Sequence, residues 1–267
     1  WASHLVDFDF GSGMYCSIAA DSNGKAHISY YDQTNGDLKY ATNVAGLAFA
    51  VTVVDAPGNV GEYTSIAVDH QGHAHISYFD ETNSQLKYAT NAGGTWANET
   101  VDNSGYSGLH TSIAIDTEGI VHISYYTGTV GLRYANNSGG SWNAITVDGG
   151  NVGVYNSLAL DSRGKAHISY YDSVNQDLMY ASVLGATVTN VVVDGSADNT
   201  GARSSIGVDT AGKVHISYYD QTNGDLRYAA QAGDFWWTST VDVAGDVGKP
   251  NSLHVDDWGV VFICYAD

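Results

Sequence analysis

One position of a repeated sequence motif changes its side chain from copy to copy, although the residues around it stay nearly the same. It lies two residues before a short apolar run such as SIAVD, and its occupants are Tyr15, Tyr63, His110, Tyr155, Arg203 and Pro250. Aromatic rings stack on flat ligand faces, and phenol, imidazole and guanidinium groups form hydrogen bonds with hydroxyl groups. The residues therefore predict a site for a sugar or another small polar ligand, built from Tyr15, Tyr63, His110, Tyr155 and Arg203. Ordinary surface variation is the alternative interpretation.

A second group of polar residues is repeated without change. In HISYYD, the residues His27, Ser29 and Tyr31 are two positions apart and share one face of an extended strand. Such a set could hold a metal ion or form a catalytic dyad. Because it recurs in at least four copies, we favour a buried set of hydrogen bonds between neighbouring repeats.

Metal and cofactor sites have weaker signals. The acidic loops at 32–37, 172–177 and 220–225 could hold calcium through their oxygen atoms, but a tight turn explains them without metal. His70, His73 and His75 crowd one hairpin, although zinc sites need three or four ligands in suitable geometry. No G-x-S-x-G nucleophile motif, phosphate loop or paired-cysteine motif is present. We therefore predict no cofactor and no metal, and we assign no catalytic residue.

The elements that position these residues follow from internal repetition. HISYYDQTNGDLKYA at 27–41 and HISYYDQTNGDLRYA at 215–229 differ at one position. The histidine recurs as His27, His75, His122, His167 and His215, and Phe262 takes its place in a sixth copy, so the repeat is about 47 residues long.

Each repeat contains four short apolar runs separated by turn residues. In the second copy the runs lie at 65–69, 73–80, 86–91 and 95–102, and Val, Ile, Tyr and Thr alternate with polar residues within them. Four antiparallel strands per repeat and six repeats predict an all-β, six-bladed β-propeller that forms a single domain over residues 1–267.

The ends of the chain predict how the ring closes. WASHLVD at the N-terminus aligns with the fourth strand of other repeats, and we expect it to complete the last blade. The last copy supplies only its first and second strands, so the third strand is absent. An unpaired strand edge recruits other strands, which predicts self-association through the incomplete last blade.

Composition excludes some partners. The chain has 10 Lys and Arg residues against 29 Asp and Glu residues, a formal net charge of −19. A surface this acidic repels phosphate backbones and anionic lipid headgroups, so we expect neither nucleic acid nor a membrane as a partner. No apolar run is long enough to span a membrane.

The repeats, for example SIAVDHQGHAHISYFD, resemble those of secreted prokaryotic β-propellers of the NHL and sialidase-like (BNR) repeat kind, over essentially the whole chain. The resemblance implies the propeller fold and an extracellular or cell-surface location. Such propellers include lectins, scaffolds, lyases and hydrolases, and the sialidase pattern S-x-D-x-G-x-x-W is not found here.

We therefore predict a non-enzymatic binding module with carbohydrate as the favoured ligand. The alternatives are a polysaccharide lyase or glycoside hydrolase that uses His110, Arg203 and a tyrosine at the channel mouth, and a purely structural repeat segment. The two cysteines, Cys16 and Cys264, align at similar heights in the first and last repeats. A disulfide that joins them and two buried free thiols are both compatible with the sequence.

Overall fold

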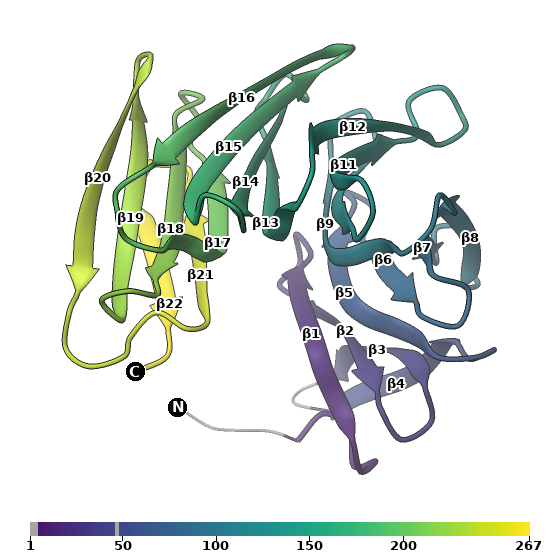
Figure 1. The fold of residues 1–267 in the computed structure, drawn as a ribbon. Coiled ribbons are helices and arrows are strands. Elements are labelled where there is room, and N and C mark those ends of the chain that lie inside the picture. Colours follow the sequence, from purple (N-terminus) through teal and green to yellow (C-terminus); the bar gives the residue numbers. More distant parts are fainter. Residues whose placement is uncertain (1–4, 46–47) are drawn as a thin grey trace.

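The computed structural model describes residues 5–45 and 48–267, and this part of the chain contains strands and no helix (Figure 1). The prediction of an all-β protein is confirmed. The strands in chain order are β1 (Ser12–Ala20), β2 (Ala26–Asp32), β3 (Asp37–Ala45), β4 (Ala48–Asp55), β5 (Val60–Val68), β6 (Ala74–Asp80), β7 (Gln85–Thr90), β8 (Ala97–Asp102), β9 (Ser107–Ile115), β10 (Val121–Thr127), β11 (Gly131–Asn136), β12 (Asn143–Gly149), β13 (Val152–Leu160), β14 (Ala166–Asp172), β15 (Asp177–Leu184), β16 (Thr187–Asp194), β17 (Thr200–Val208), β18 (Val214–Asp220), β19 (Asp225–Ala232), β20 (Phe235–Asp242), β21 (Asn251–Val255) and β22 (Val261–Tyr265).

Successive groups of four strands form antiparallel sheets in which each strand pairs with the next one along the chain. The first to fifth sheets are β1–β4, β5–β8, β9–β12, β13–β16 and β17–β20, and β21 and β22 form a sixth, two-stranded sheet. The first strands β1, β5, β9, β13, β17 and β21 pack side by side in that order, so they form the inner edge of an arc of sheets (Figure 1). This arrangement is consistent with a β-propeller.

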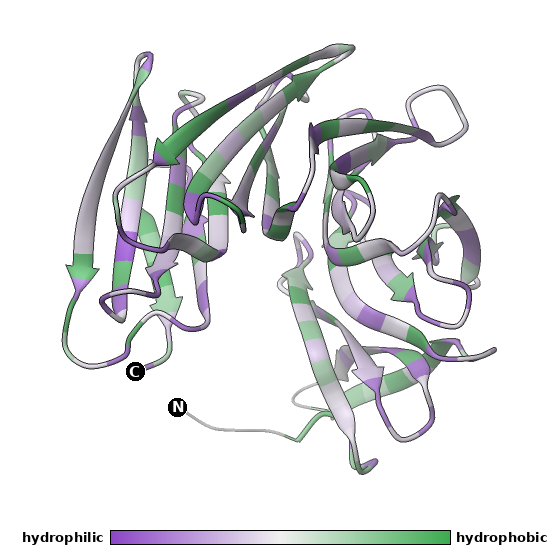
Figure 2. Cartoon of the chain, in the orientation of Figure 1, coloured by the Kyte–Doolittle hydropathy of each residue, from purple (hydrophilic) through white to green (hydrophobic). Residues whose placement is uncertain are grey.

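The core lies in layers between neighbouring sheets. Hydrophobic and hydrophilic residues alternate along many strands (Figure 2), yet every residue of β6 is buried because both faces of its sheet are covered. One layer packs Leu38 and Tyr40 of the first sheet against Ile66, Ile76 and Tyr78 of the second. Equivalent layers join the second sheet to the third, the third to the fourth, and the fourth to the fifth.

A glycine near the start of each first strand allows this close packing. Gly61 has a φ of +110°, and a Cβ atom there would lie 2.8 Å from Cα of Leu38 in the preceding sheet. Gly108, Gly153, Gly201 and Gly248 approach the leucines of their own preceding sheets in the same way. Glycine is therefore required at this position by the backbone conformation and by the neighbouring strand.

A buried tyrosine and a carboxylate also join neighbouring sheets. The hydroxyl of Tyr78 donates a hydrogen bond to Asp55, which ends the fourth strand of the preceding sheet and also pairs with Lys87. In the first sheet Tyr30 makes the same bond to Asp7 over 2.8 Å. The segment before β1 therefore takes the place that the end of a preceding fourth strand has elsewhere.

The prediction of a closing N-terminal strand is not borne out in the described residues. Residues 1–4 of WASHLVD lie outside them, and residues 5–10 are not in a strand. Asp7 supplies the repeated carboxylate from this irregular segment instead. The sixth sheet has two strands, as its sequence indicated. In the described part of the chain, no helix is long and apolar enough to cross a membrane.

Candidate functional site

The five predicted site residues lie inside the first strands and not before them. Tyr15, Tyr63, His110, Tyr155 and Arg203 are each the fourth residue of their strand, with φ angles between +51° and +55°. The strands begin five residues earlier than the apolar runs indicated, because a β-bulge near this point interrupts each ladder and its alternation. A left-handed conformation is unfavourable for these residue types and is typical of functional sites.

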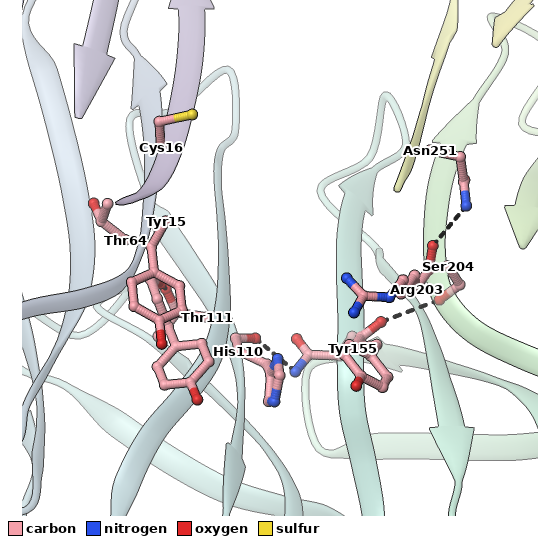
Figure 3. A pocket seen from close by; sticks show the side chains of 11 residues that line it. Tyr15, Cys16, Thr64, His110, Thr111, Tyr155, Arg203, Ser204 and Asn251 are labelled. Atoms are coloured by element: carbon pink, nitrogen blue, oxygen red, sulfur yellow. Dashed lines mark hydrogen bonds between the residues drawn. The ribbon is translucent and has the colours of Figure 1, made fainter. Parts of the chain in front are cut away.

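Side chains of the following sheet hold these strained residues in place. The backbone carbonyl of His110 accepts a hydrogen bond from Nδ2 of Asn156 over 2.8 Å, and that of Tyr63 accepts one from Oγ1 of Thr111 over 2.8 Å. Ser204 and Asn251 donate in the same way to the carbonyls of Tyr155 and Arg203 (Figure 3). Four of the five bulge residues, all except Tyr15, are therefore anchored to the next sheet through their backbone carbonyls.

The structure brings all five residues together around one cavity of about 280 Å³ at the inner edge of the arc. Their side chains form a continuous row of tilted and edge-to-face contacts, which we call the stack. The ring centroids of Tyr15 and Tyr63 are 4.6 Å apart, and those of Tyr63 and His110 are 4.7 Å apart. His110 lies 4.9 Å from Tyr155, and the guanidinium of Arg203 lies 5.3 Å from the Tyr155 ring (Figure 3). The cavity volume lies just below the range of about 300–1,000 Å³ that is typical of ligand pockets.

The stack is nearly uncharged. Burial, followed by the charge of Arg203, lowers the pKa of His110 to about 4, so its imidazole is neutral at pH 7. Burial, followed by the neighbouring Tyr15, raises the pKa of Tyr63 to about 12, so its phenol keeps its proton. Among the lining residues in the described part of the chain, none is a carboxylate and Arg203 carries the positive charge.

A second ring of lining residues was not predicted as part of the site. It consists of Cys16, Thr64, Thr111, Asn156, Ser204 and Asn251. Each directly follows a residue of the varied position, and Asn251 follows Pro250, which does not line the cavity. Their sequence signal is a small polar residue at one fixed position of almost every copy. Because adjacent residues of a regular strand point to opposite faces, only the bulge explains why both rings line one cavity.

The repeated histidine set has a structural role. The hydroxyl of Tyr40 and Nδ1 of His27 are 2.6 Å apart within the first sheet, and Ser29 accepts a hydrogen bond from Thr64 of the second sheet over 2.8 Å. Tyr31 donates to Asn59 over 2.5 Å. Serine and tyrosine therefore connect neighbouring sheets as expected, whereas histidine bonds within its own sheet.

The acidic loops use their carboxylates for their own turns. Asp32 accepts hydrogen bonds from the backbone amides of Thr34 and Asn35 and from Nδ2 of Asn35. Asp172 and Asp220 make the same contacts in their loops. Across residues 5–45 and 48–267, no group of three or more His, Cys, Asp or Glu side chains has the arrangement of a metal site.

Comparisons with known proteins show the fold. No protein-family model matches the sequence, and no curated protein sequence matches it significantly. Among solved structures, AofleA from Arthrobotrys oligospora has a TM-score of 0.65 at 13% identity, covering 96% of this chain and 79% of that one.

A mutant of Aleuria aurantia lectin in complex with Fucα1-6GlcNAc has a TM-score of 0.60 at 16% identity and covers 98% of this chain and 89% of that one. A polysaccharide lyase of family PL25, an ulvan lyase bound to -[GlcA(1-4)Rha3S]-, has a TM-score of 0.54 at 13% identity. The match covers 82% of this chain and 69% of that one. The resemblance to NHL and sialidase-like repeats in particular stays a prediction.

Proposed function

We propose that the chain is a non-enzymatic, extracellular or cell-surface binding module that holds a glycan at the mouth of the central channel of a six-bladed β-propeller. In this proposal the six repeats are the blades of a single domain over residues 1–267. The observation that carries it is the continuous stack of Tyr15, Tyr63, His110, Tyr155 and Arg203 around one cavity.

The stack suits a sugar in three ways. Its rings offer apolar faces to the C–H groups of a pyranose, and its hydroxyl, imidazole and guanidinium groups form hydrogen bonds with sugar hydroxyls. The bulge conformation is already fixed by the following sheet, so little ordering is needed on binding. The lectin among the similar structures, with its bound disaccharide, adds support.

A glycan array identifies the ligand, and calorimetry with the best glycan then tests the site. We expect Tyr63→Ala to weaken binding about tenfold through the loss of one stacked ring. The double variant H110A/R203A should abolish measurable binding. Tyr106→Ala is the matched control, because Tyr106 is 49% exposed and lies outside the cavity. Unchanged affinity of H110A/R203A for a confirmed glycan would contradict the assignment.

A lyase is the second candidate, and one observation favours it. His110 is neutral at pH 7 and lies between two tyrosines, with Arg203 beyond Tyr155, so the cavity holds a base, phenolic acids and a cation. A uronate-containing polysaccharide incubated with the protein would then give an unsaturated product that absorbs ultraviolet light. If the polysaccharide binds but no unsaturated product forms, the lyase proposal is wrong and the binding-module proposal stands.

Self-association through β22 remains part of the proposal. β22 pairs only with β21 in the described residues, and Phe262 beside this free edge is 55% exposed. Light scattering over a concentration series tests it, and a strict monomer at high concentration would contradict it.

A further inference from the structure

A pair of small polar side chains is repeated at every junction between neighbouring sheets. A serine in the second strand of one sheet bonds to the residue of the second lining ring in the next sheet, over 2.6–2.8 Å. We call this the junction pair. Its five examples are Ser29–Thr64, Ser77–Thr111, Ser124–Asn156, Ser169–Ser204 and Ser217–Asn251.

The two cysteines occupy the two halves of a sixth junction pair. Cys264 stands in β22 where the other repeats have the serine, and it lies opposite Ser252 as the first-sheet Ser29 lies opposite Ser17. Cys16 stands in β1 where the others have Thr64, Thr111, Asn156, Ser204 and Asn251. They are the two cysteines of the sequence, and both are exposed free thiols here.

We call the two facing sides of β1 and the sixth sheet the seam. Two further residues of β1 lack the packing contacts that their equivalents have at the other junctions. Ile18 is 68% exposed, whereas its equivalents Ile66, Ile113, Leu158, Ile206 and Leu253 are 6–8% exposed. A Cβ atom on Gly13 would meet nothing within 4 Å, whereas one on Gly61 would meet Leu38. Within the described residues, β1 therefore has the side chains of a junction but no sheet packed against them.

Hydrogen bonding shows the same difference on the other side of the seam. At five junctions the first-strand serine of one sheet accepts a hydrogen bond from a backbone amide of the next, as Ser205 does from Leu253 over 2.9 Å. Ser252 is the sixth of these serines, and it is exposed. Its partner by register would be the amide of Ile18.

We propose that the sixth sheet packs against β1 as a sixth junction, and that Cys16 and Cys264 form a disulfide in the place of the junction pair. At the other junctions the paired atoms already lie 2.6–2.8 Å apart, so two sulfur atoms at the same positions need only a small shift to reach the bond length of about 2.0 Å. The cross-link would fix Tyr15, which precedes Cys16, at one end of the ligand stack.

The oxidant is a small-molecule disulfide such as oxidised glutathione. The thiolate of Cys16 attacks one sulfur atom of glutathione disulfide, whose S–S bond breaks and releases one glutathione thiolate. The thiolate of Cys264 then attacks the Cys16 sulfur of the mixed disulfide and releases the second. The two released thiolates take up the two protons that the cysteines lost, so the protein loses two electrons and glutathione disulfide gains them.

The test starts from the full, fully reduced chain, which is then incubated with oxidised glutathione. We expect thiol titration of the unfolded protein to fall from two thiols to none, and peptide mass mapping to show Cys16 linked to Cys264 in a monomer. The melting temperature should rise by about 5–10 °C and return on reduction. Two free thiols, glutathione adducts on the separate cysteines, or a covalent dimer would each overturn the proposal.

The variant C16T/C264S is the matched control, because it places at the seam the Thr and Ser of the Ser29–Thr64 junction pair. We expect it to fold with an unchanged circular dichroism spectrum and to show no change in melting temperature on addition of oxidised glutathione. If the variant shows the same rise as the natural sequence, a disulfide is not its cause and the proposal is wrong.

Discussion

The junction between the first and second sheets and the seam between the sixth sheet and β1 carry equivalent residues in different surroundings. At the junction, Ile66 is 6% exposed and Ser29 is completely buried. At the seam, Ile18 is 68% exposed and Cys264 is open to solvent. The comparison teaches that equivalent residues stabilise the fold only where a neighbouring sheet covers them. Equivalent substitutions at the junction and at the seam should therefore change the free energy of unfolding by unequal amounts.

Truncation of the repeated isoleucine should show the largest contrast. We expect Ile66→Ala to lower the free energy of unfolding by about 2–5 kcal/mol, because it leaves a cavity in a packed layer. Ile18→Ala should cost less than about 1 kcal/mol in the reduced protein, since its side chain is mostly exposed. Urea denaturation of both variants measures the difference.

Repeating the isoleucine measurements on oxidised protein sharpens the comparison. If the cross-linked sixth sheet covers β1, the cost of Ile18→Ala should approach that of Ile66→Ala. Equal costs for both variants in the reduced protein would instead mean that the seam is already closed in solution.

The repeated glycine gives a second matched pair. In Gly61→Ala the new Cβ meets the backbone of Leu38 at 2.8 Å and the φ of +110° is unfavourable, so we expect a loss of about 2–4 kcal/mol. Gly13→Ala meets nothing within 4 Å and should cost only the backbone strain, about 1 kcal/mol. Thermal denaturation checks both values, and a larger loss for Gly13→Ala than for Gly61→Ala would contradict the packing argument.

Acid should weaken the complete sheets through their buried histidines. Burial lowers the pKa of His167 from 6.5 to about 4, so between these values the unfolded chain binds more protons than the folded one. The contribution of His167 to the free energy of unfolding is fully present above pH 6.5 and is lost as the pH falls toward 4. The loss between pH 7.5 and pH 5 should be about 2 kcal/mol for His167 alone.

A pair of variants isolates this effect. His167→Gln should reduce the slope of stability against pH, because an amide can still bond to the Tyr180 hydroxyl but does not titrate. His70→Gln is the control, because it makes the same substitution at an exposed histidine. A slope that is the same in both variants and in the natural sequence would remove His167 as its origin. The sixth copy has Phe262 at this position, a side chain that does not titrate.

Much of this architecture could be predicted because repetition and alternation report it directly. The runs around Ile66 and Ile76 indicated strands, and the varied position of Tyr15, Tyr63 and His110 indicated one shared site. The bulge could not be predicted, because a φ of about +50° at tyrosine contradicts local preference and is imposed by contacts with the next sheet. The irregular segment that carries Asp7 could not be predicted for the same reason, because its hydrogen bond to Tyr30 is a tertiary contact.

The smallest expected contrast concerns a single hydrogen bond. The hydroxyl of Ser205 accepts the backbone amide of Leu253 over 2.9 Å at a partly buried position, so Ser205→Ala should cost about 0.5–1.5 kcal/mol. Ser252 has the same place in the sixth sheet but is exposed to solvent, so Ser252→Ala should change the free energy of unfolding of the reduced protein by less than about 0.5 kcal/mol. Because β21 carries both Leu253 and Ser252, the two variants compare the covered and uncovered faces of the same strand. Chemical denaturation at one pH resolves them, and a Ser252→Ala cost equal to that of Ser205→Ala in reduced protein would show that the seam forms its sixth junction without the cysteines.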